Sequence, residues 1–221
     1  MKQIGDLTHQ KVVDMACGEG YFTRLLRQAE AETVLGFDIS ERMIDLARDQ
    51  EAQNPLGIDY LVADARTPNP QAQEFDLAVS AWLLVYAHNR SELALMCEGI
   101  ASWLRPGGRF VTYTTNPNLY HFKPFPNYQK YGFEIFLEDN IYEGASILWK
   151  AYLQDSILEV ENYYLPISAY QEAFEKAGFK DFAIHQPTLS PAVQKSQDYS
   201  EDYWQDFLQY PPGILMDCVK I

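Results

Sequence analysis

The segment 12–20, Val-Val-Asp-Met-Ala-Cys-Gly-Glu-Gly, carries residues that could hold a nucleotide-like ligand. An apolar run ends here in a glycine-rich turn, and glycine lets such a ligand press against bare backbone. The dinucleotide fingerprint G-x-G-x-x-G also requires glycine at position 23, but Thr23 stands there, which disfavours close pyrophosphate binding. The carboxylate of Asp14 suits instead the ammonium of a bound amino acid, reached directly or through water. The turn therefore favours a ligand that joins a nucleoside to an amino acid.

The carboxylates Asp38 and Asp64 stand at the ends of the next two predicted strands. Asp38 lies 20 residues beyond Gly18, where its oxygens can accept hydrogen bonds from both ribose hydroxyls, a feature shared with NAD enzymes. Asp64 is placed to receive the exocyclic amine of adenine, while Ala65 supplies a backbone N–H for a ring nitrogen. Apolar walls around that ring are expected from Ile39, Met43 and Ala65.

The elements that must position these residues alternate between strand and helix. Short apolar runs predict buried strands at 11–17, 33–39, 58–64, 75–84 and 109–115. Helical spacing predicts helices at 21–30, 40–54 and 89–104, with Ser40 and either Asn89 or Ser91 as N-caps. This alternation indicates an α/β fold with a Rossmann-like, doubly wound and mostly parallel sheet.

Between residues 116 and 166 this rhythm changes. Two antiparallel strands are predicted at 146–153 and 157–165, which indicates an antiparallel insertion after the fifth strand. A helix capped by Ser168 and ended by Gly178 follows, then a strand at 181–185 and a run at 214–221 that could close the sheet. Because neither a repeat nor a long linker is found, residues 1–221 predict a single domain, with its core at 10–115 and 167–221 and a substrate-side insertion at about 116–166.

This set of residues resembles the class I S-adenosylmethionine-dependent methyltransferases. The resemblance rests on the glycine motif at 14–20, the acidic strand end at Asp38, the Asp64-Ala65 pair and the turn at 104–108, over roughly residues 10 to 115. It implies S-adenosyl-L-methionine as cofactor and S-adenosyl-L-homocysteine as product. The residues implied to contact the cofactor are Asp14, Ala16, Cys17, Gly18, Gly20, Asp38, Ile39, Met43, Asp64, Ala65 and Ala81.

A closer resemblance is to the toxoflavin synthase-like branch of these enzymes. It is carried by the segments 16–24, 86–87, 131–133 and 177–179, and it implies N-methylation of an azapteridine-type heterocycle. Such enzymes usually carry a helical segment before the first strand, whereas only about ten residues precede Lys11 here. We therefore expect a cofactor pocket open to water, unless the tail and the insertion cover it.

Methyl transfer needs an aligned nucleophile more than a catalytic side chain. Where the acceptor carries a proton, a nearby base can help to remove it, and the candidates are His88, Tyr86 and Tyr21 from loops at the carboxyl edge of the strands. For His88 the alternative is a solvent-exposed residue that leads into a helix. For the two tyrosines the alternative is simple pocket lining.

The region from Tyr113 to Tyr170 is rich in aromatic residues. It holds 14 of the 31 Phe, Trp and Tyr residues of the chain, which would suit a flat aromatic acceptor held by stacking. The candidate acceptor-binding residues are Tyr131, Phe133, Trp149 and Tyr164. The alternative is that these side chains pack the insertion onto the main sheet. The four histidines are scattered without metal-ligand spacing, so no metal is predicted.

The composition disfavours several kinds of partner. Lys and Arg number 17 against 31 Asp and Glu, giving a formal net charge of −14, whereas nucleic-acid binding calls for clustered cations. The residues 80–83 also lack the acidic or Asn residue, prolines and aromatic of DNA amino-methylating enzymes. Because no apolar run approaches roughly 20 residues and no secretion signal is found, a cytoplasmic protein without membrane contact is expected.

The expected function is methyl transfer to a small molecule, in its most specific form N-methylation of an aromatic heterocycle. A cofactor-binding protein without turnover is the main alternative, motivated by the short N-terminal segment. A methyltransferase that acts on protein or nucleic acid is another. A nicotinamide oxidoreductase is opposed by Thr23 and Asp14. The sequence leaves the oligomeric state open.

Overall fold

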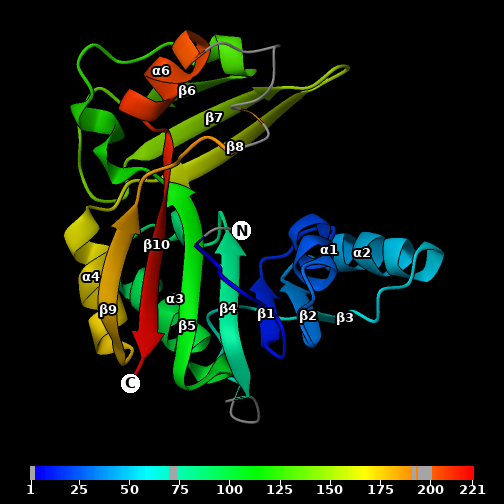
Figure 1. Cartoon of the computed structure of the whole chain (residues 1–221). Helices are drawn as coiled ribbons and strands as arrows, with labels where there is room; N and C mark the ends of the chain where they lie inside the picture. The colour runs from blue at the N-terminus through cyan, green and yellow to red at the C-terminus, as the bar shows by residue number, and fades with distance from the viewer. Residues whose placement is uncertain (1–2, 70–73, 191–192, 194–200) are drawn as a thin grey trace.

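A mostly parallel, seven-stranded sheet lies at the centre of the molecule (Figure 1). The computed structural model describes residues 3–69, 74–190, 193 and 201–221. The strand order is β3-β2-β1-β4-β5-β10-β9, and β10 runs antiparallel to both of its neighbours. The strands are β1 (Lys11–Met15), β2 (Thr33–Asp38), β3 (Asp59–Val62), β4 (Phe75–Ala81), β5 (Leu104–Thr115), β9 (Phe179–His185) and β10 (Gly213–Lys220). The predicted doubly wound α/β fold is confirmed.

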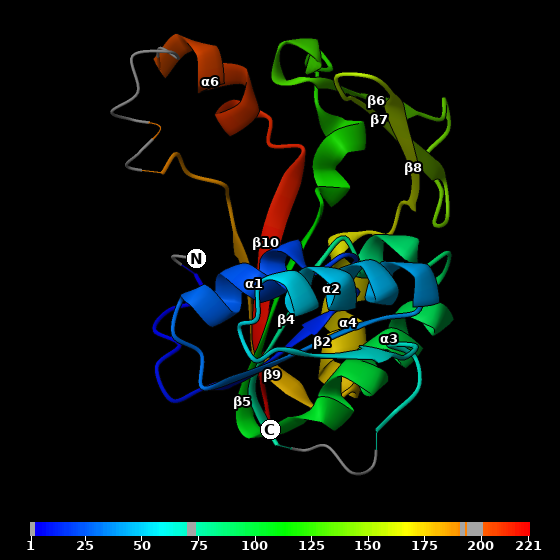
Figure 2. The same ribbon diagram turned by 90° about the vertical axis from the view of Figure 1, so that its right-hand side faces the viewer.

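Helices cover the two faces of this sheet. The helices α1 (Tyr21–Gln28) and α2 (Glu41–Gln53) lie on one face, and α3 (Arg90–Trp103) and α4 (Ile167–Lys176) lie on the other (Figure 2). The alternation of β1 shows the division, because Val12 packs with Leu26 of α1 while Val13 packs with Leu93 of α3. No helix within the described residues is long and apolar enough to span a membrane.

Side-chain caps begin the helices α2 and α3. The Ser40 side chain accepts the backbone N–H of Met43, and Asn89 accepts that of Glu92, so both predicted caps hold. The predicted cap at Ser168 is wrong. The helix α4 begins one residue earlier, at Ile167, and follows Pro166, whose extended backbone leads into the first turn without a side-chain cap.

A second, three-stranded antiparallel sheet forms the insertion. Its strands are β6 (Phe133–Leu137), β7 (Ser146–Tyr152) and β8 (Ile157–Tyr163), so both predicted strands exist and β6 is an additional one. The insertion lies beyond the edge to which the arrowheads of β4 and β5 point (Figures 1 and 2). The helix α6 (Glu201–Gln209) packs there as well, since Trp204 stacks on Tyr131 with ring centroids 5.3 Å apart. Part of the segment 167–221 therefore packs on the insertion instead of on the main sheet.

Candidate active site

The glycine turn after β1 is held in a left-handed backbone conformation. Gly18 has φ +55° and Gly20 has φ +86°, values that glycine adopts without the steric cost of a side chain. A Cβ on Gly20 would collide with Tyr60 Oη, whereas a Cβ on Gly18 would meet no protein atom. The Cys17 N–H donates to Phe37 O over 3.0 Å and ties the turn to β2. The turn is thus packed on its Gly20 side and open on its Gly18 side.

Gly18 opens onto a cavity of about 600 Å³ at the carboxyl edge of the sheet. Besides Gly18, its lining includes Phe37, Asp38, Ile39, Met43, Asp64, Ala65, Arg66, Ala81, Trp82, Tyr86, His88, Glu92 and Met96. The Asp38 carboxylate sits at the turn, where Oδ2 accepts the Gly18 N–H over 3.0 Å and Oδ1 accepts the Ser40 N–H over 2.8 Å. Since a carboxylate has about four acceptor positions, Asp38 retains capacity for two hydroxyl donors.

Asp64, one strand further along the edge, has a partner that the sequence had not suggested. Arg66 donates from Nε to Oδ1 over 3.0 Å and from Nη2 to Oδ2 over 2.6 Å, and its backbone N–H donates to Oδ1 over 2.9 Å. The hydrogen bonds from Arg66 hold the pKa of the Asp64 carboxyl below its usual range. Any amine that approaches Asp64 must share this carboxylate with Arg66 or displace it.

The predicted cofactor residues divide into two groups. Those that line the cavity are Ala16, Gly18, Asp38, Ile39, Met43, Asp64, Ala65 and Ala81. The other three do not line it, for separate steric reasons. The Cys17 side chain is buried beneath the turn beside Gly36, Gly20 faces Tyr60, and Asp14 faces a second cavity. Asp14 lines that second cavity, close enough to Asp38 for their charges to interact, and its role toward a cofactor ammonium stays a prediction.

The residues that line the larger cavity fit S-adenosylmethionine on the chemistry of their donor set. Two carboxylates at neighbouring strand ends suit ribose hydroxyls and the adenine amine. Ile39, Met43 and Met96 supply apolar surface for the ring, and the space beside Gly18 is free of protein atoms. A cavity of about 600 Å³ also has the size of a typical small-molecule site.

The second cavity, of about 360 Å³, lies between α1 and the strands β4, β5 and β10. It is lined by Ile4, Asp14, Phe22, Leu25, Leu26, Val79, Ser80, Ala81, Trp82, Val111, Tyr113 and Leu215. Asp14 is only 3 % exposed, and burial raises the pKa of its carboxyl to about 7, although Thr23 Oγ1 donates a 2.7 Å hydrogen bond to it. The two cavities share Ala81 and Trp82, so they meet at the end of β4.

Two of the three candidate bases line the larger cavity. Tyr86 and His88 do so, whereas Tyr21 lines neither cavity and is 65 % exposed. The His88 ring is held by a 2.9 Å contact between Nδ1 and the Glu92 carboxylate and lies against Tyr163 with centroids 3.8 Å apart. Burial, followed by the negative charge of Asp38, raises the pKa of the Tyr86 hydroxyl.

The candidate acceptor residues of the insertion pack against one another and line neither cavity. Phe133 stacks on Trp149 at 5.2 Å, and the Tyr131 hydroxyl donates to Tyr203 O over 2.6 Å while its ring stacks on α6. Tyr164 is buried edge-on against Tyr120. These side chains therefore have packing partners in the insertion and α6, and their contact with an acceptor stays a prediction.

Trp82 is a site residue that the sequence did not predict, as are Arg66, Glu92 and Met96 of the larger cavity. It lines both cavities, and its ring meets Trp149 edge-on with centroids 4.9 Å apart. Its backbone has φ +64°, a conformation that costs a bulky residue about 1–2 kcal/mol and tends to occur at functional sites. Its position directly after β4, at the carboxyl edge of the sheet, is the feature that could have identified it.

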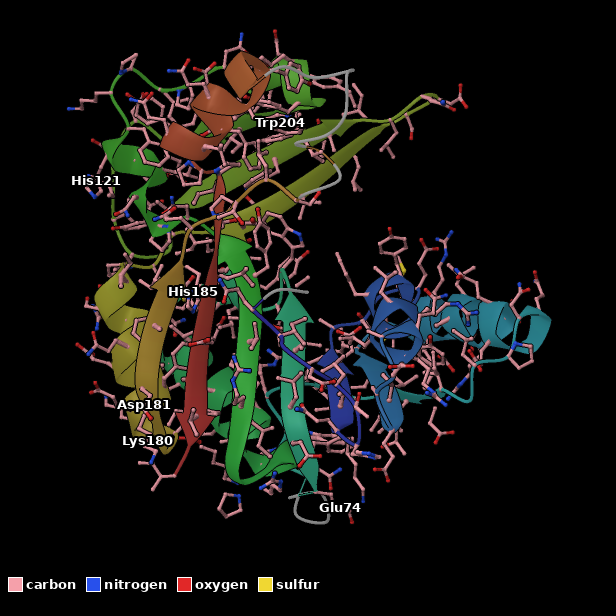
Figure 3. All side chains as sticks on the ribbon, in the orientation of Figure 1. Glu74, His121, Lys180, Asp181, His185 and Trp204 are labelled. Atoms are coloured by element: carbon pink, nitrogen blue, oxygen red, sulfur yellow. The ribbon has the colours of Figure 1, made fainter. Side chains whose placement is uncertain are left out.

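Metal-ligating side chains do not gather in the described part of the chain. No group of three or more His, Cys, Asp or Glu side chains there could hold a metal ion. His121 projects beside the insertion and His185 from β9, well apart from each other, whereas Trp204 lies on α6 (Figure 3).

Comparison with known proteins agrees with this geometry. Residues 12–108 match the family model described as a methyltransferase domain. The chain is 25 % identical over 184 residues to N-demethylindolmycin N-methyltransferase from Streptomyces griseus, which covers 82 % of this chain and 74 % of that protein. These matches support an S-adenosylmethionine-dependent methyltransferase. The segment matched by the family model contains Asp38, Asp64 and Trp82, whereas the insertion lies outside it.

Further relatives agree with the assignment at different coverage. The chain is 31 % identical over 113 residues to ubiquinone biosynthesis O-methyltransferase from Coxiella burnetii. The match covers 51 % of this chain and 47 % of that protein. Its fold matches the crystal structure of an S-adenosylmethionine-dependent methyltransferase from Mesorhizobium loti with a TM-score of 0.68 at 20 % identity, covering 99 % of this chain and 94 % of that one. The structural match extends over the insertion, which the family model does not include.

Proposed function

We propose that this methyltransferase N-methylates a small aromatic heterocycle and holds S-adenosylmethionine in the larger cavity. The observation that carries the proposal is the pair of carboxylates, Asp38 and Asp64, at adjacent strand ends in one cavity of about 600 Å³ beside Gly18. When bound, the cofactor supplies an electrophilic methyl group on a sulfonium. Asp38 accepts hydrogen bonds from the ribose, and Asp64 with the Ala65 N–H recognises adenine.

The contribution of the chain to the reaction is alignment first and proton removal second. Ala81 and Trp82 stand where the two cavities meet, so they define the boundary across which the reacting atoms face each other. His88 is the proposed proton acceptor, because it lines the larger cavity and is oriented by Glu92. Tyr86 also lines that cavity, but its raised pKa keeps the hydroxyl protonated, so its proposed role is to orient the acceptor through a hydrogen bond. Tyr21, on the exposed side of α1, has no such support.

The choice of a nitrogen acceptor has two supports. The Streptomyces griseus relative is named as an N-methyltransferase. The residues at 16–24 and 131–133 resemble the toxoflavin synthase-like branch, which methylates a heterocycle. A single domain, with its core at 10–115 and 167–221, and a cytoplasmic location stay predictions.

Turnover with a panel of N-heterocycles tests the proposal. The protein is incubated with S-adenosylmethionine and each heterocycle, and S-adenosylhomocysteine and methylated product are quantified by mass spectrometry. We expect the two products in equal amounts, with loss of both in Asp38→Ala and retention in Asp45→Ala, whose exposed side chain lies on α2 outside both cavities.

Two outcomes would contradict the proposed function. Cofactor binding without turnover on any heterocycle would indicate a binding protein. Methyl transfer to proteins of a cell lysate, but to none of the heterocycles, would indicate a protein methyltransferase.

A further inference from the structure

The smaller cavity differs in character from the cofactor site that it adjoins. Its walls come from α1, β4, β5 and β10, and they consist mainly of aliphatic and aromatic side chains. Asp14 of β1 and Ser80 of β4 are the small polar side chains of the lining, to which Trp82 and Tyr113 add an indole N–H and a hydroxyl. The cavity meets the larger one at Ala81 and Trp82 and nowhere else among their lining residues.

We propose that this smaller cavity is the acceptor site and that the acceptor is a flat, uncharged heteroaromatic ring with an N–H group on the edge that faces Asp14. The inference rests on the proposed function, because it takes the larger cavity as the cofactor site. It assigns recognition of the acceptor to the main sheet and α1, and not to the aromatic residues of the insertion.

The shape argument starts from Trp82. Its ring is fixed on two sides, edge-on to Tyr113 at 5.0 Å and edge-on to Trp149 at 4.9 Å. Phe22 of α1 adds a further aromatic ring to the same cavity. Rigid aromatic walls favour a planar partner, which gains stacking or edge contacts in addition to area burial. A volume of about 360 Å³ lies at the lower end of small-molecule sites and suits a ring system of two or three fused rings.

The charge argument starts from Asp14. Because Asp14 is buried, an unpaired ion beside it would be costly, and an anion would also be repelled by Asp14 and by Asp38. A protonated amine could pair with Asp14, but it has no lone pair with which to accept a methyl group. An uncharged ring with one N–H and a second, unprotonated nitrogen satisfies both conditions. The N–H donates to the Asp14 carboxyl, which among the described residues accepts a side-chain hydrogen bond from Thr23 alone. The lone pair of the second nitrogen takes the methyl group as the C–S bond of the sulfonium breaks, and the methylated ring then releases its N–H proton to solvent.

Ser80 extends this polar edge. Its hydroxyl is 2.8 Å from the Thr112 hydroxyl, and both side chains are buried. One of these hydroxyls donates to the other, so the Ser80 oxygen keeps either a proton or a lone pair for a ring heteroatom. An acceptor with a second ring nitrogen next to the N–H edge would therefore find a second partner.

Binding of benzimidazole to the protein saturated with S-adenosylhomocysteine tests the inference. Benzimidazole is flat, uncharged and carries an N–H, and its binding is followed by ligand-observed NMR and calorimetry. We expect saturable binding in the millimolar range or tighter. Benzothiazole, which lacks the N–H, should bind at least about fivefold more weakly. The anion benzimidazole-5-carboxylate should bind at least about tenfold more weakly.

Variants that fill the cavity locate the probe. Leu25→Trp on α1 and, independently, Leu215→Phe on β10 should each weaken benzimidazole binding at least about tenfold and leave S-adenosylhomocysteine affinity within twofold of wild type, because neither residue lines the larger cavity. Leu95→Trp is the matched control, since this exposed residue of α3 lines neither cavity.

The outcomes separate the two claims. Benzimidazole binding that is absent, or that is equal in Leu25→Trp, Leu215→Phe and wild type while S-adenosylhomocysteine still binds, overturns the acceptor site alone. Failure of wild type to bind S-adenosylhomocysteine overturns the proposed function, and the acceptor site falls with it.

Discussion

Each of the two cavities contains an aspartate, and the pKa of this aspartate is shifted in opposite directions in the two cavities. In the larger one, Asp64 is paired with Arg66 at the surface, and its pKa is lowered by those hydrogen bonds. In the smaller one, Asp14 is buried beneath α1, and desolvation raises its pKa to about 7. The carboxyl ends of two strands in the same sheet therefore offer different chemistry, depending on whether a helix covers the strand end.

The two cavities, which meet at the end of β4, also suit different kinds of ligand. The carboxylates and backbone of the larger cavity suit a polar nucleoside, whereas the aromatic and aliphatic walls of the smaller one suit an apolar ring. Trp82, with its left-handed backbone, belongs to both. Four substitutions test whether the two cavities act separately, and they follow in order of decreasing free-energy effect.

Asp14→Asn tests the buried carboxyl through stability. The unfolded chain releases the Asp14 proton near pH 4, whereas the folded protein keeps it until about pH 7. Folding of wild type therefore loses up to about 4 kcal/mol from this group as pH rises from 4 to 7, and nothing further above pH 7. Asn does not titrate and can still accept the Thr23 hydrogen bond. The free energy of unfolding of the variant, relative to wild type, should rise over that range.

Urea unfolding at pH 4.5, 5.5, 6.5, 7.5 and 8.5 measures this difference. The matched control is Asp45→Asn, an exposed carboxyl on α2. If the free energies of unfolding of wild type and Asp14→Asn change with pH in parallel, Asp14 is not buried as described.

Gly18→Val tests the open side of the glycine turn. A valine side chain at this position projects where no protein atom lies, beside the proposed cofactor, so S-adenosylhomocysteine affinity should fall at least about 100-fold, or about 2.7 kcal/mol. Gly57→Val is the control, because Gly57 also has a positive φ and free space around it but lies outside both cavities. Equal loss of affinity in the two variants would mean that backbone strain, and not the site, is responsible. Calorimetry supplies the affinities.

Asp38→Ala tests the ribose contact. Loss of a charged hydrogen-bond acceptor should weaken S-adenosylhomocysteine binding about 30-fold, or about 2 kcal/mol, and benzimidazole binding much less. Calorimetric titration of each ligand separates the two effects, with Asp45→Ala as the control. If Asp38→Ala weakens benzimidazole binding as strongly as S-adenosylhomocysteine binding, the two ligands do not occupy separate cavities.

Trp149→Leu tests the link between the insertion and the smaller cavity. Without the edge contact from Trp149, the Trp82 ring is less fixed, so benzimidazole binding should weaken about fivefold, or about 1 kcal/mol, with cofactor affinity within twofold. Phe136→Leu, at an exposed position on β6, serves as the control in the same calorimetric experiment. An unchanged benzimidazole affinity in Trp149→Leu would show that the contact between the insertion and Trp82 contributes nothing to acceptor binding.

Much of the cofactor cavity could be predicted because its determinants are local. The apolar runs, the caps at Ser40 and Asn89 and the glycine turn lie within short segments, and parallel strand order brings Asp38 and Asp64 to one edge. The pairing of Asp64 with Arg66 is equally local, at two residues' separation, yet a surface arginine next to a carboxylate has too many possible orientations to be assigned from the sequence.

The smaller cavity and the insertion could not be predicted because they depend on contacts between distant segments. The orientation of Asp14 follows from the packing of α1, and the position of Trp82 follows from a left-handed backbone that the residue type disfavours. The strand β6 and the helix α6 are short, and their aromatic residues find partners such as Tyr131 with Trp204, more than 70 positions apart. The aromatic-rich segment predicted ring contacts, but its composition did not decide between contact with an acceptor and packing of the insertion.

A crystal structure with S-adenosylhomocysteine tests the central claim most directly. The account predicts adenosine in the larger cavity, with the ribose hydroxyls at Asp38 and adenine between Ile39, Met43 and Ala65. It also predicts that the sulfur lies toward Ala81 and Trp82, where the smaller cavity begins. S-adenosylhomocysteine bound elsewhere, or a cavity left empty in crystals grown at saturating ligand, would contradict it.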